Sequence, residues 1–527
     1  MRRSDADGKA RGRRLLEAAA ALMLGGAFGQ CFGRPHWGGA AIVLLALFVA
    51  LLWRHDAPQP GARARRAALL GECFGVGWFC TGVWWLYVSM AVYGGMPPAL
   101  AGGAVLLFAA YLALYTAASA ALAAALAPPH ARGPWPLARA LAAAMALAGA
   151  WTLGELARGT VFTGFPWLAL GYAQAGDVLA GYAPLLGMYG VTFAAALAAA
   201  LLALLSQVSV RGAAAAIAAL AVLIGGAHVV GRLRWTHADG APLRVALLQG
   251  DVAQSDKFNA DALGPTLELY GQWLRSLRAD LIVTPETALP VLPEDLPPGY
   301  LASVRQALRA HHAQALVGIP LTRGTDQYTN SVVGLGGAAP YRYDKSHLVP
   351  FGEFIPWGFH WFVRLMRIPL GDFARGTLDQ RSFVVHGARV APTICYEDLF
   401  GEQLAQRFRD PTSAPQVIAN LTNLGWFGNT IVLGQHLEIA RMRSLEFQLP
   451  TIRATNTGAT AIIGAGGRVR RMLAPYTVGV LTGAVQPRSG LTPFAWLASR
   501  LGYAPQLLLG LLALAPAALR RRRGNTR

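Results

Sequence analysis

The chain has 527 residues, which is long enough for more than one domain. Hydrophobic residues make up 54% of it and charged residues only 14%, which excludes an ordinary soluble protein and indicates membrane spans. Lys and Arg outnumber Asp and Glu by 46 to 27, but the basic residues flank apolar runs, so they indicate helix orientation in a bilayer and argue against a nucleic-acid-binding protein.

Eight apolar segments approach the roughly 20 residues that a helix needs to cross a bilayer. They are rich in Ala, Leu and Gly, which suits close helix packing in lipid. The first has no persuasive cleavage site and is interpreted as a span rather than a signal peptide. The segments are 15–32, 38–53, 69–89, 99–127, 137–156, 185–206, 212–231 and 505–519.

The basic residues also predict which side of the membrane each connection faces. Lys and Arg gather at both termini and after the second, fourth and sixth segments, whereas the short connections on the other side hold Arg34 and Arg158. Since cytoplasmic loops are enriched in Lys and Arg, both termini are expected in the cytoplasm. Residues 235–500 are then expected outside, between a seven-span bundle over 1–234 and a last span with a basic tail over 501–527.

The insert 235–500 is predicted to be an α/β domain. Strand-like runs alternate with helical stretches such as 266–277 and 301–311, which implies a buried sheet covered by helices. The insert is long enough to bury one sizeable core. The strand-like runs are 244–248, 280–283, 315–319, 331–335, 389–394 and 417–420.

Three polar residues at or beyond the ends of strand-like runs are candidates for chemistry. Glu286 follows an apolar run, at a position where ligands bind in α/β sheets. Lys345 lies in a run rich in aromatic residues, Pro and Gly, with Glu353 eight residues later. Cys395 follows a β-branched run and precedes Tyr-Glu-Asp. Taken singly, a solvated carboxylate, a surface lysine and an inert buried cysteine are the commoner alternatives.

Together, these side-chain types would suffice for acyl transfer through a thioester. A free thiol has a pKa of about 8.5 and needs help to attack at neutral pH. A carboxylate can accept its proton, and an ammonium group favours the thiolate and stabilises an oxyanion. The other three cysteines lie in apolar segments, so neither a disulfide framework nor a thiolate zinc site is expected. Spacing alone leaves open whether the three residues meet.

The same segments carry a resemblance to a known family. Residues 285–288, 345–353 and 394–397 resemble the Glu, Lys and Cys motifs of the nitrilase, or carbon–nitrogen hydrolase, superfamily. The resemblance to the apolipoprotein N-acyltransferase family is closer and covers nearly the whole chain. The further runs that fit this family are 162–167, 248–250, 440–443 and 453–458.

The resemblance implies an α-β-β-α sandwich for the insert and an enzyme of the bacterial inner membrane whose catalytic domain is periplasmic. A phospholipid, typically phosphatidylethanolamine, would pass an acyl chain to Cys395. The α-amine of a diacylglyceryl-cysteine apolipoprotein would then accept it. No metal or organic cofactor is expected because the thiol carries the acyl group. Contact with membrane lipids is expected, and the protein is expected to be a monomer.

The resemblance also assigns roles. Glu286 would be the general base, and Lys345 would hold the oxyanion and favour the thiolate. Glu353 would orient Lys345, and the backbone N–H near Tyr396 would complete an oxyanion hole. Glu397, in the same motif, is assigned a supporting role.

Aromatic residues near these motifs are candidates for substrate binding. Phe351, Phe354 and Trp357 follow Lys345 and are predicted to form a lid or a membrane-dipping arm, with core packing as an equally weighted alternative. Trp426 would line the acyl pocket, or it would fill core.

Two other functions stay open. A membrane-tethered amidase or nitrilase that uses water as acceptor fits the same three residues, but a small soluble amide needs no eight-helix base. A transporter or scaffold with an inactive enzyme domain would show no dependence on Cys395.

Overall fold

The computed structural model describes residues 2–54, 59–128, 133–257, 259–324, 327–355 and 373–525. The chain divides into two compact units. The helical unit comprises Met1–Tyr87, Pro97–Leu233 and Tyr503–Arg527, and the α/β unit comprises Val88–Met96 and Arg234–Gly502. The short segment Val88–Met96 thus belongs to the α/β unit, although helices of the helical unit precede and follow it in the chain.

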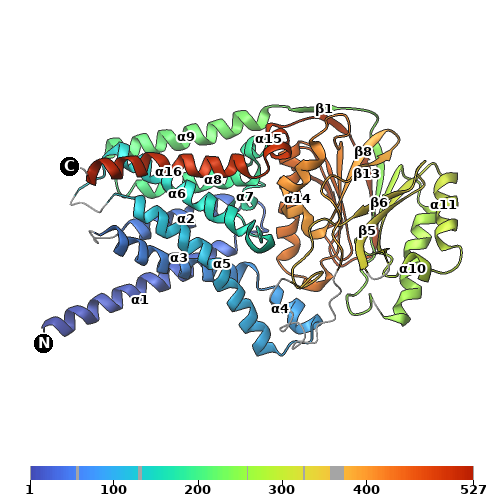
Figure 1. The fold of residues 1–527 in the computed structure, drawn as a ribbon, viewed down its shortest axis with the longest axis horizontal. Helices are drawn as coiled ribbons and strands as arrows, with labels where there is room; N and C mark the ends of the chain where they lie inside the picture. Colours follow the sequence, from blue (N-terminus) through green and yellow to red (C-terminus); the bar gives the residue numbers. More distant parts are fainter. Residues whose placement is uncertain are drawn as a thin grey trace. The chain divides into compact units, whose positions relative to one another are not determined.

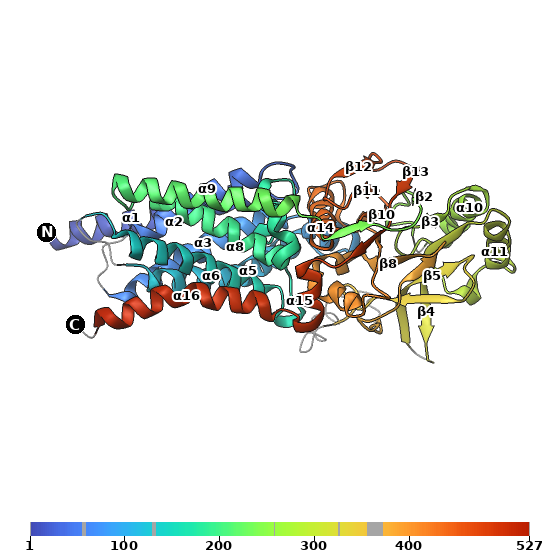
Figure 2. The same cartoon turned by 90° about the horizontal axis from the view of Figure 1, so that it is seen from above.

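Each apolar segment predicted from the sequence falls mainly in a helix. Among the described residues, four helical segments are long and apolar enough to cross a membrane, or up to six if each of two bent helix pairs is one span. The helices are α1 (Arg2–Gly29), α2 (Gly38–Trp53), α3 (Pro60–Gly82), α5 (Pro98–Leu126), α6 (Leu137–Arg158), α8 (Ala183–Leu204), α9 (Val210–Arg232) and α16 (Ala504–Asn525). Figures 1 and 2 show them running side by side. The bundle is therefore built from apolar helices, as expected for a membrane protein.

Close approach of α3 and its neighbours depends on glycine. A Cβ atom at Gly75 would lie 2.7 Å from Cα of Ala113 on α5, and one at Gly77 would lie 2.1 Å from the backbone oxygen of Leu22 on α1. No larger side chain fits at either position without moving a helix. Small residues at such contacts allow backbones to approach and gain van der Waals contact in lipid.

Two buried charged side chains tie the irregular stretch after α6 to that helix. The Glu155 carboxylate accepts a hydrogen bond from the backbone N–H of Leu170 at 2.9 Å. Arg158 donates to the backbone oxygens of Phe165 at 2.7 Å and Trp167 at 2.6 Å. Irregular backbone within an apolar bundle needs such partners because water is excluded. Both charges therefore have a structural role.

The described part of the α/β unit contains two six-stranded sheets and a third sheet that pairs β1 (Thr236–Ala238) with β14 (Arg488–Gly490). Sheet I has the order β13 (Gly479–Val485), β2 (Leu243–Gln249), β3 (Leu281–Val283), β4 (Gln314–Arg323), β5 (Gln327–Leu335) and β6 (Tyr341–Asp344). Sheet II has the order β12 (Val469–Met472), β11 (Ala461–Ile463), β10 (Thr451–Thr455), β9 (Val417–Thr422), β8 (Ala388–Ile394) and β7 (Phe383–Val385).

In each sheet the three neighbouring strands at the centre are parallel and the outer pairs are antiparallel. β2, β3 and β4 form the parallel part of sheet I, and β8, β9 and β10 that of sheet II. One hydrophobic cluster contains residues of both sheets, including Val245 and Leu316 of sheet I and Val390 and Leu421 of sheet II. The two sheets therefore pack face to face and share a core.

Helices cover the outer faces of both sheets. On sheet I, Leu274 of α10 (Ala260–Ser276) and Val304 of α11 (Tyr300–Ala310) pack with Ile282. On sheet II, Phe447 of α14 (Val432–Phe447) packs with Ile418, and α15 (Pro493–Leu501) joins the same cluster. Figure 1 shows the resulting layers, with α10 and α11 on one side and α14 on the other.

The strands and helices predicted for the insert are confirmed at all eight places, but the sequence missed half of the strands of the two sheets. β7 and β11 have three residues each, and β12 is a Val-Arg-Arg-Met strand whose side chains are mostly exposed. Parallel strands direct their carboxyl ends to one edge of a sheet, where functional groups gather. The residues that follow β3, β8 and β9 therefore define the candidate site.

Candidate active site

The structure brings Glu286, Lys345 and Cys395 together. Glu286 lies beyond the end of β3, Cys395 directly follows β8, and Lys345 directly follows β6. The Nζ atom of Lys345 donates hydrogen bonds to Oε1 of Glu286 at 3.2 Å and to Oε1 of Glu353 at 2.9 Å. The charges of Glu286, Lys345 and Glu353 all act on the pKa of the Cys395 thiol. Three segments that are distant in sequence thus form one cluster. We call Glu286, Lys345, Glu353 and Cys395 the charged cluster.

A turn with unusual backbone geometry presents the thiol. Cys395 begins the short helix η5 (Cys395–Leu399), and its φ of +50° lies in the left-handed region. This conformation costs a residue other than glycine about 1–3 kcal/mol and persists only where its surroundings enforce it. The Glu397 carboxylate accepts the backbone N–H of Ile394 at 2.7 Å and the backbone N–H of Ser346 at 2.6 Å. Glu397 therefore ties the cysteine turn to the turn after β6.

Glu286 is held as a carboxylate. Burial is the largest single influence and raises the pKa of Glu286, but the ammonium groups of Lys345 and Lys257, together with the hydrogen bonds that the carboxylate accepts, lower it by more. Oε1 accepts Nδ2 of Asn330 at 2.8 Å, and Oε2 accepts the backbone N–H of Asn423 at 3.0 Å. The net effect is a pKa below the ordinary value. Glu286 is thus available to accept a proton at neutral pH.

The Cys395 thiol and the Lys345 ammonium, in contrast to Glu286, are both held in the protonated form. Burial raises the pKa of the Cys395 thiol, Glu286 raises it further, and Lys345 only partly opposes them. Burial lowers the pKa of Lys345, but Glu286 and Glu353 raise it by more, so the ammonium form persists. The resting site therefore pairs a neutral thiol with an ionised carboxylate. Attack by sulfur then requires proton transfer at the moment of reaction rather than a preformed thiolate.

Asn330, which lies within β5 opposite Pro320 of β4, was not predicted as a site residue. Its Nδ2 donates to Glu286 at 2.8 Å and to Glu353 at 2.7 Å, so one amide bridges two carboxylates. Glu353 also accepts the backbone N–H of Val349 at 2.9 Å. Asn330 follows a short polar run in the sequence, and only the pairing of β5 with its neighbours places it in the site.

Replacing Asn330 by aspartate is expected to slow acyl transfer at least about 100-fold. The variant would lose both donated hydrogen bonds and add a third carboxylate to a buried site, at a cost of about 3 kcal/mol or more. Initial rates of purified protein measure the effect. Asn259→Asp is the matched control, because Asn259 is an exposed helix cap where aspartate serves equally well. A variant rate within threefold of wild type would contradict a bridging role.

Of the other residues predicted near Lys345 and Cys395, the structure describes Tyr396, Phe351 and Phe354. Tyr396 is buried, with its ring centroid 5.3 Å from that of Phe400. Phe351 is 39% exposed, and the ring of Phe354 lies 4.6 Å below the guanidinium of Arg375. Trp357 falls in 356–372, outside the described residues. The predicted lid or arm therefore stays a prediction.

Trp426 lies in η7 (Gly425–Phe427), shortly after Asn423, and is 39% exposed. Its ring meets the edge of Tyr93 at a centroid distance of 6.1 Å. Tyr93 belongs to the segment Val88–Met96, which sequence analysis did not connect with the site. Trp426 thus has an aromatic neighbour and an exposed face.

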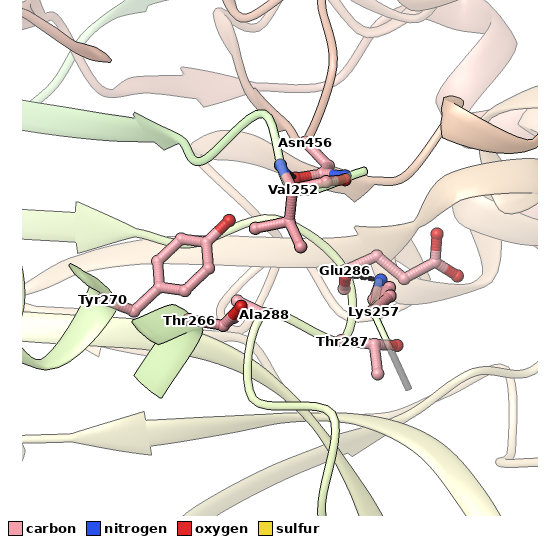
Figure 3. Close-up of a pocket in the computed structure, with 8 residues that line it drawn as sticks. All are labelled: Val252, Lys257, Thr266, Tyr270, Glu286, Thr287, Ala288 and Asn456. Atoms are coloured by element: carbon pink, nitrogen blue, oxygen red, sulfur yellow. Dashed lines mark hydrogen bonds between the residues drawn. The ribbon is translucent and has the colours of Figure 1, made fainter. Parts of the chain in front are cut away.

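A small pocket adjoins the backbone of Glu286. Its volume, with the open space at its mouth included, is about 190 Å³. Figure 3 shows the Lys257 ammonium at the Glu286 end of this pocket. In the described part of the chain, no group of three or more His, Cys, Asp and Glu side chains is placed to hold a metal ion. The lining residues are Val252, Lys257, Thr266, Tyr270, Glu286, Thr287, Ala288 and Asn456.

Comparison with known families covers both parts of the chain. Residues 24–201 match the apolipoprotein N-acyltransferase N-terminal domain, and residues 244–493 match the carbon-nitrogen hydrolase family. Among solved structures, a carbon-nitrogen hydrolase from Helicobacter pylori G27 is 15% identical with a TM-score of 0.35, covering 51% of this chain and 94% of that chain.

Full-length relatives are much closer. An apolipoprotein N-acyltransferase from Ralstonia nicotianae is 46% identical over 513 residues, which cover 96% of this chain and 94% of that protein. Another from Verminephrobacter eiseniae is 46% identical over 500 residues, covering 88% of this chain and 90% of that protein. The predicted family and enzyme class are therefore confirmed: the chain is an acyltransferase that belongs to the apolipoprotein N-acyltransferase family.

Proposed function

We propose that this enzyme transfers a fatty acyl chain from a phospholipid to the α-amine of the N-terminal diacylglyceryl-cysteine of apolipoproteins, with a thioester on Cys395 as the intermediate. The observation that carries the proposal is the Cys395 turn beside a carboxylate and an ammonium group that are hydrogen-bonded to each other. The names of the relatives supply the acceptor class.

In the first half-reaction, the sulfur of Cys395 attacks the carbonyl carbon of a phospholipid ester while its proton passes to Glu286. The Lys345 ammonium stabilises the negative charge on the tetrahedral oxygen, together with the backbone N–H near Tyr396. The carbon–oxygen bond then breaks, and the leaving oxygen takes the proton from Glu286. The products are a lysophospholipid and the acyl thioester, so protons balance.

In the second half-reaction, the free α-amine of the lipoprotein cysteine attacks the thioester carbon. Glu286 accepts a proton from the amine, and the carbon–sulfur bond breaks as the amide forms. The departing sulfur takes that proton back and restores the thiol. Glu353 and Asn330 keep Lys345 and Glu286 aligned through both steps. The family's acceptor is lipid-anchored, which explains why the site is fused to a bundle of apolar helices.

We also propose the membrane arrangement given by the charge pattern. All eight apolar helical segments would span the inner membrane, with both termini in the cytoplasm and the catalytic region, about 235–500, in the periplasm. Phosphatidylethanolamine is the proposed donor, and a monomer would suffice. Phe351, Phe354, Trp357 and Trp426 are the proposed contacts for acyl chains.

An assay with defined lipids tests the proposal. Purified enzyme in detergent is given phosphatidylethanolamine of one acyl length, and intact-protein mass spectrometry should show that one chain is added. A diacylglyceryl lipopeptide added next should gain the chain as the enzyme loses it. Release of free fatty acid without acylated peptide would identify a hydrolase instead. A donor whose acyl chains never reach the protein or the peptide would refute phospholipid as the donor class.

A further inference from the structure

Lys257 is a second buried lysine at the charged cluster. It lies in the loop between β2 and α10, with only 7% of its side chain exposed, and its Nζ donates to the backbone oxygen of Glu286 at 3.0 Å. Figure 3 shows this bond, with the ammonium close to the Glu286 backbone. Lysine side chains are rarely buried unless they are paired or functional. The burial of Lys257 beside Glu286 therefore calls for an explanation.

A network of amides fixes the loop that carries Lys257. The backbone N–H of Val252 donates to Oδ1 of Asn456 at 3.0 Å, and Nδ2 of Asn456 donates back to the Val252 oxygen at 2.7 Å. Nδ2 of Asn423 donates to Oε1 of Gln254 at 2.8 Å. Asn423 is the residue whose backbone N–H binds Glu286. The loop and the carboxylate are thus held by the same framework.

The charges that face Lys257 belong to the reaction centre. Burial lowers the pKa of Lys257 to about 8, while the negative charges of Glu286 and Cys395 oppose that effect. In return, Lys257 helps to lower the pKa of Glu286, where burial acts in the opposite sense. The other titratable groups nearby are Asp251 and Asp256 on the same loop and Tyr270 of α10, which lines the same pocket. The Asp256 carboxylate is exposed and accepts the Ser255 hydroxyl at 3.0 Å.

Counting charges shows what Lys257 contributes. The cluster contains two carboxylates, Glu286 and Glu353, and without Lys257 it has one ammonium group, that of Lys345. With Lys257 charged, the resting cluster is neutral. Without that charge the cluster has a net charge of −1, and the thiolate would form beside an uncompensated negative charge. In a site of low effective dielectric, such a charge interacts strongly with the neighbouring charged groups.

We propose that Lys257 is a positioning residue of the acyl-transfer reaction, which holds the backbone of Glu286 and supplies the second positive charge that lets the Cys395 proton pass to Glu286. This role rests on the proposed function of Cys395 as nucleophile. Lys257 touches neither the acyl group nor the attacking sulfur in this scheme. Its support is present while the ammonium is charged, below about pH 8, and is lost as the pH rises through that value.

The test measures how fast iodoacetamide alkylates Cys395 in lipid-free, full-length enzyme, with peptide mass spectrometry to separate Cys395 from the other cysteines. Lys257→Met should lower the rate about tenfold at pH 6–7, the change that one unit of thiol pKa produces. The ratio of wild-type to variant rates should fall toward one above pH 9. Lys257→Arg should restore the rate and keep it high through pH 9. Asp256→Asn, an exposed change in the same loop, should leave the rate unaltered.

Equal alkylation of Lys257→Met and wild type at pH 7 would overturn the proposal, and so would a ratio independent of pH. If the Met variant does not fold, the wild type alone decides. The ratio of the Cys395 alkylation rate to that of a free thiol must then change slope with pH near pH 8. A ratio whose slope stays constant across pH 8 refutes the proposal. In the lipid assay, Lys257→Met should lower kcat with little change in KM. Because alkylation uses no lipid, the expected pH-dependent difference in alkylation, found in an enzyme that transfers no acyl chain, would refute the proposed function and leave standing only the coupling of Lys257 to Cys395.

Discussion

Cys395→Ala is expected to reduce acyl transfer by at least about 10⁴-fold, because the proposed intermediate cannot form without the thiol. The variant should still fold. Alanine occupies the same left-handed backbone position as cysteine and keeps the Cβ atom, while the turn is fixed from outside by Glu397. Mass spectrometry after incubation with phospholipid should therefore show one added acyl chain on wild type and none on the variant.

The chain offers a matched control for this experiment. Cys73 lies in α3 of the helical unit, and like Cys395 it is partly exposed and forms no disulfide. Cys73→Ala should acylate like wild type. An acyl chain that still appears on the Cys395→Ala protein, with thermal unfolding unchanged, would rule out Cys395 as the nucleophile.

Lys345→Met is expected to abolish acyl transfer and to destabilise the α/β unit by about 3–5 kcal/mol. Lys345 is 1% exposed and forms ion pairs with two buried carboxylates, and removal of one partner from a buried ion pair leaves the other charge uncompensated. Chemical unfolding followed by a probe in the α/β unit measures the loss. The double variant Lys345→Met with Glu353→Gln should regain most of the stability and none of the activity, because one carboxylate is removed but the oxyanion partner is still missing.

The loss of stability in Lys345→Met is expected to become smaller as the pH falls. In wild type the pKa of Glu286 is lowered, so its contribution to stability is present above the unfolded value of about 4.3 and is lost as the pH falls through the folded pKa. In Lys345→Met the facing carboxylates repel, which raises one pKa and makes protonation favour the folded state. The stability difference should therefore narrow as the pH falls from 7 to 4. A difference that stays constant or widens over this range would contradict the charge arrangement.

Much of the fold was accessible from sequence because its signals are local. Hydropathy marked the helices of the bundle, and β-branched runs marked the buried central strands of both sheets. The missed strands lack such patterns. β10 carries Arg453 and two threonines, all fully buried, in a run that is indistinguishable from a polar loop until its partners are known. Edge strands such as β12 are short and exposed, so no apolar alternation forms.

The candidate site also contains residues that local sequence patterns revealed and residues that they did not. Glu286, Lys345 and Cys395 lie in runs with recognisable motifs, and the structure places them within one cluster. Lys257 lies in Ser-Asp-Lys-Phe-Asn, a composition typical of a solvated turn, and its burial depends on Asn423 and Asn456, which are about 170 and 200 residues away along the chain. Contacts made at such sequence distances are a property of the folded state.

The membership of Val88–Met96 in the α/β unit has a consequence for dissecting this protein. The polypeptide passes between the units four times, after residues 87, 96, 233 and 502. A single protease cut at any one of these crossings would leave the units covalently connected. Conversely, a recombinant fragment starting at Arg234 would lack Tyr93, and the ring of Trp426 would lose this aromatic neighbour. A fragment that begins at Arg234 is therefore an incomplete α/β unit.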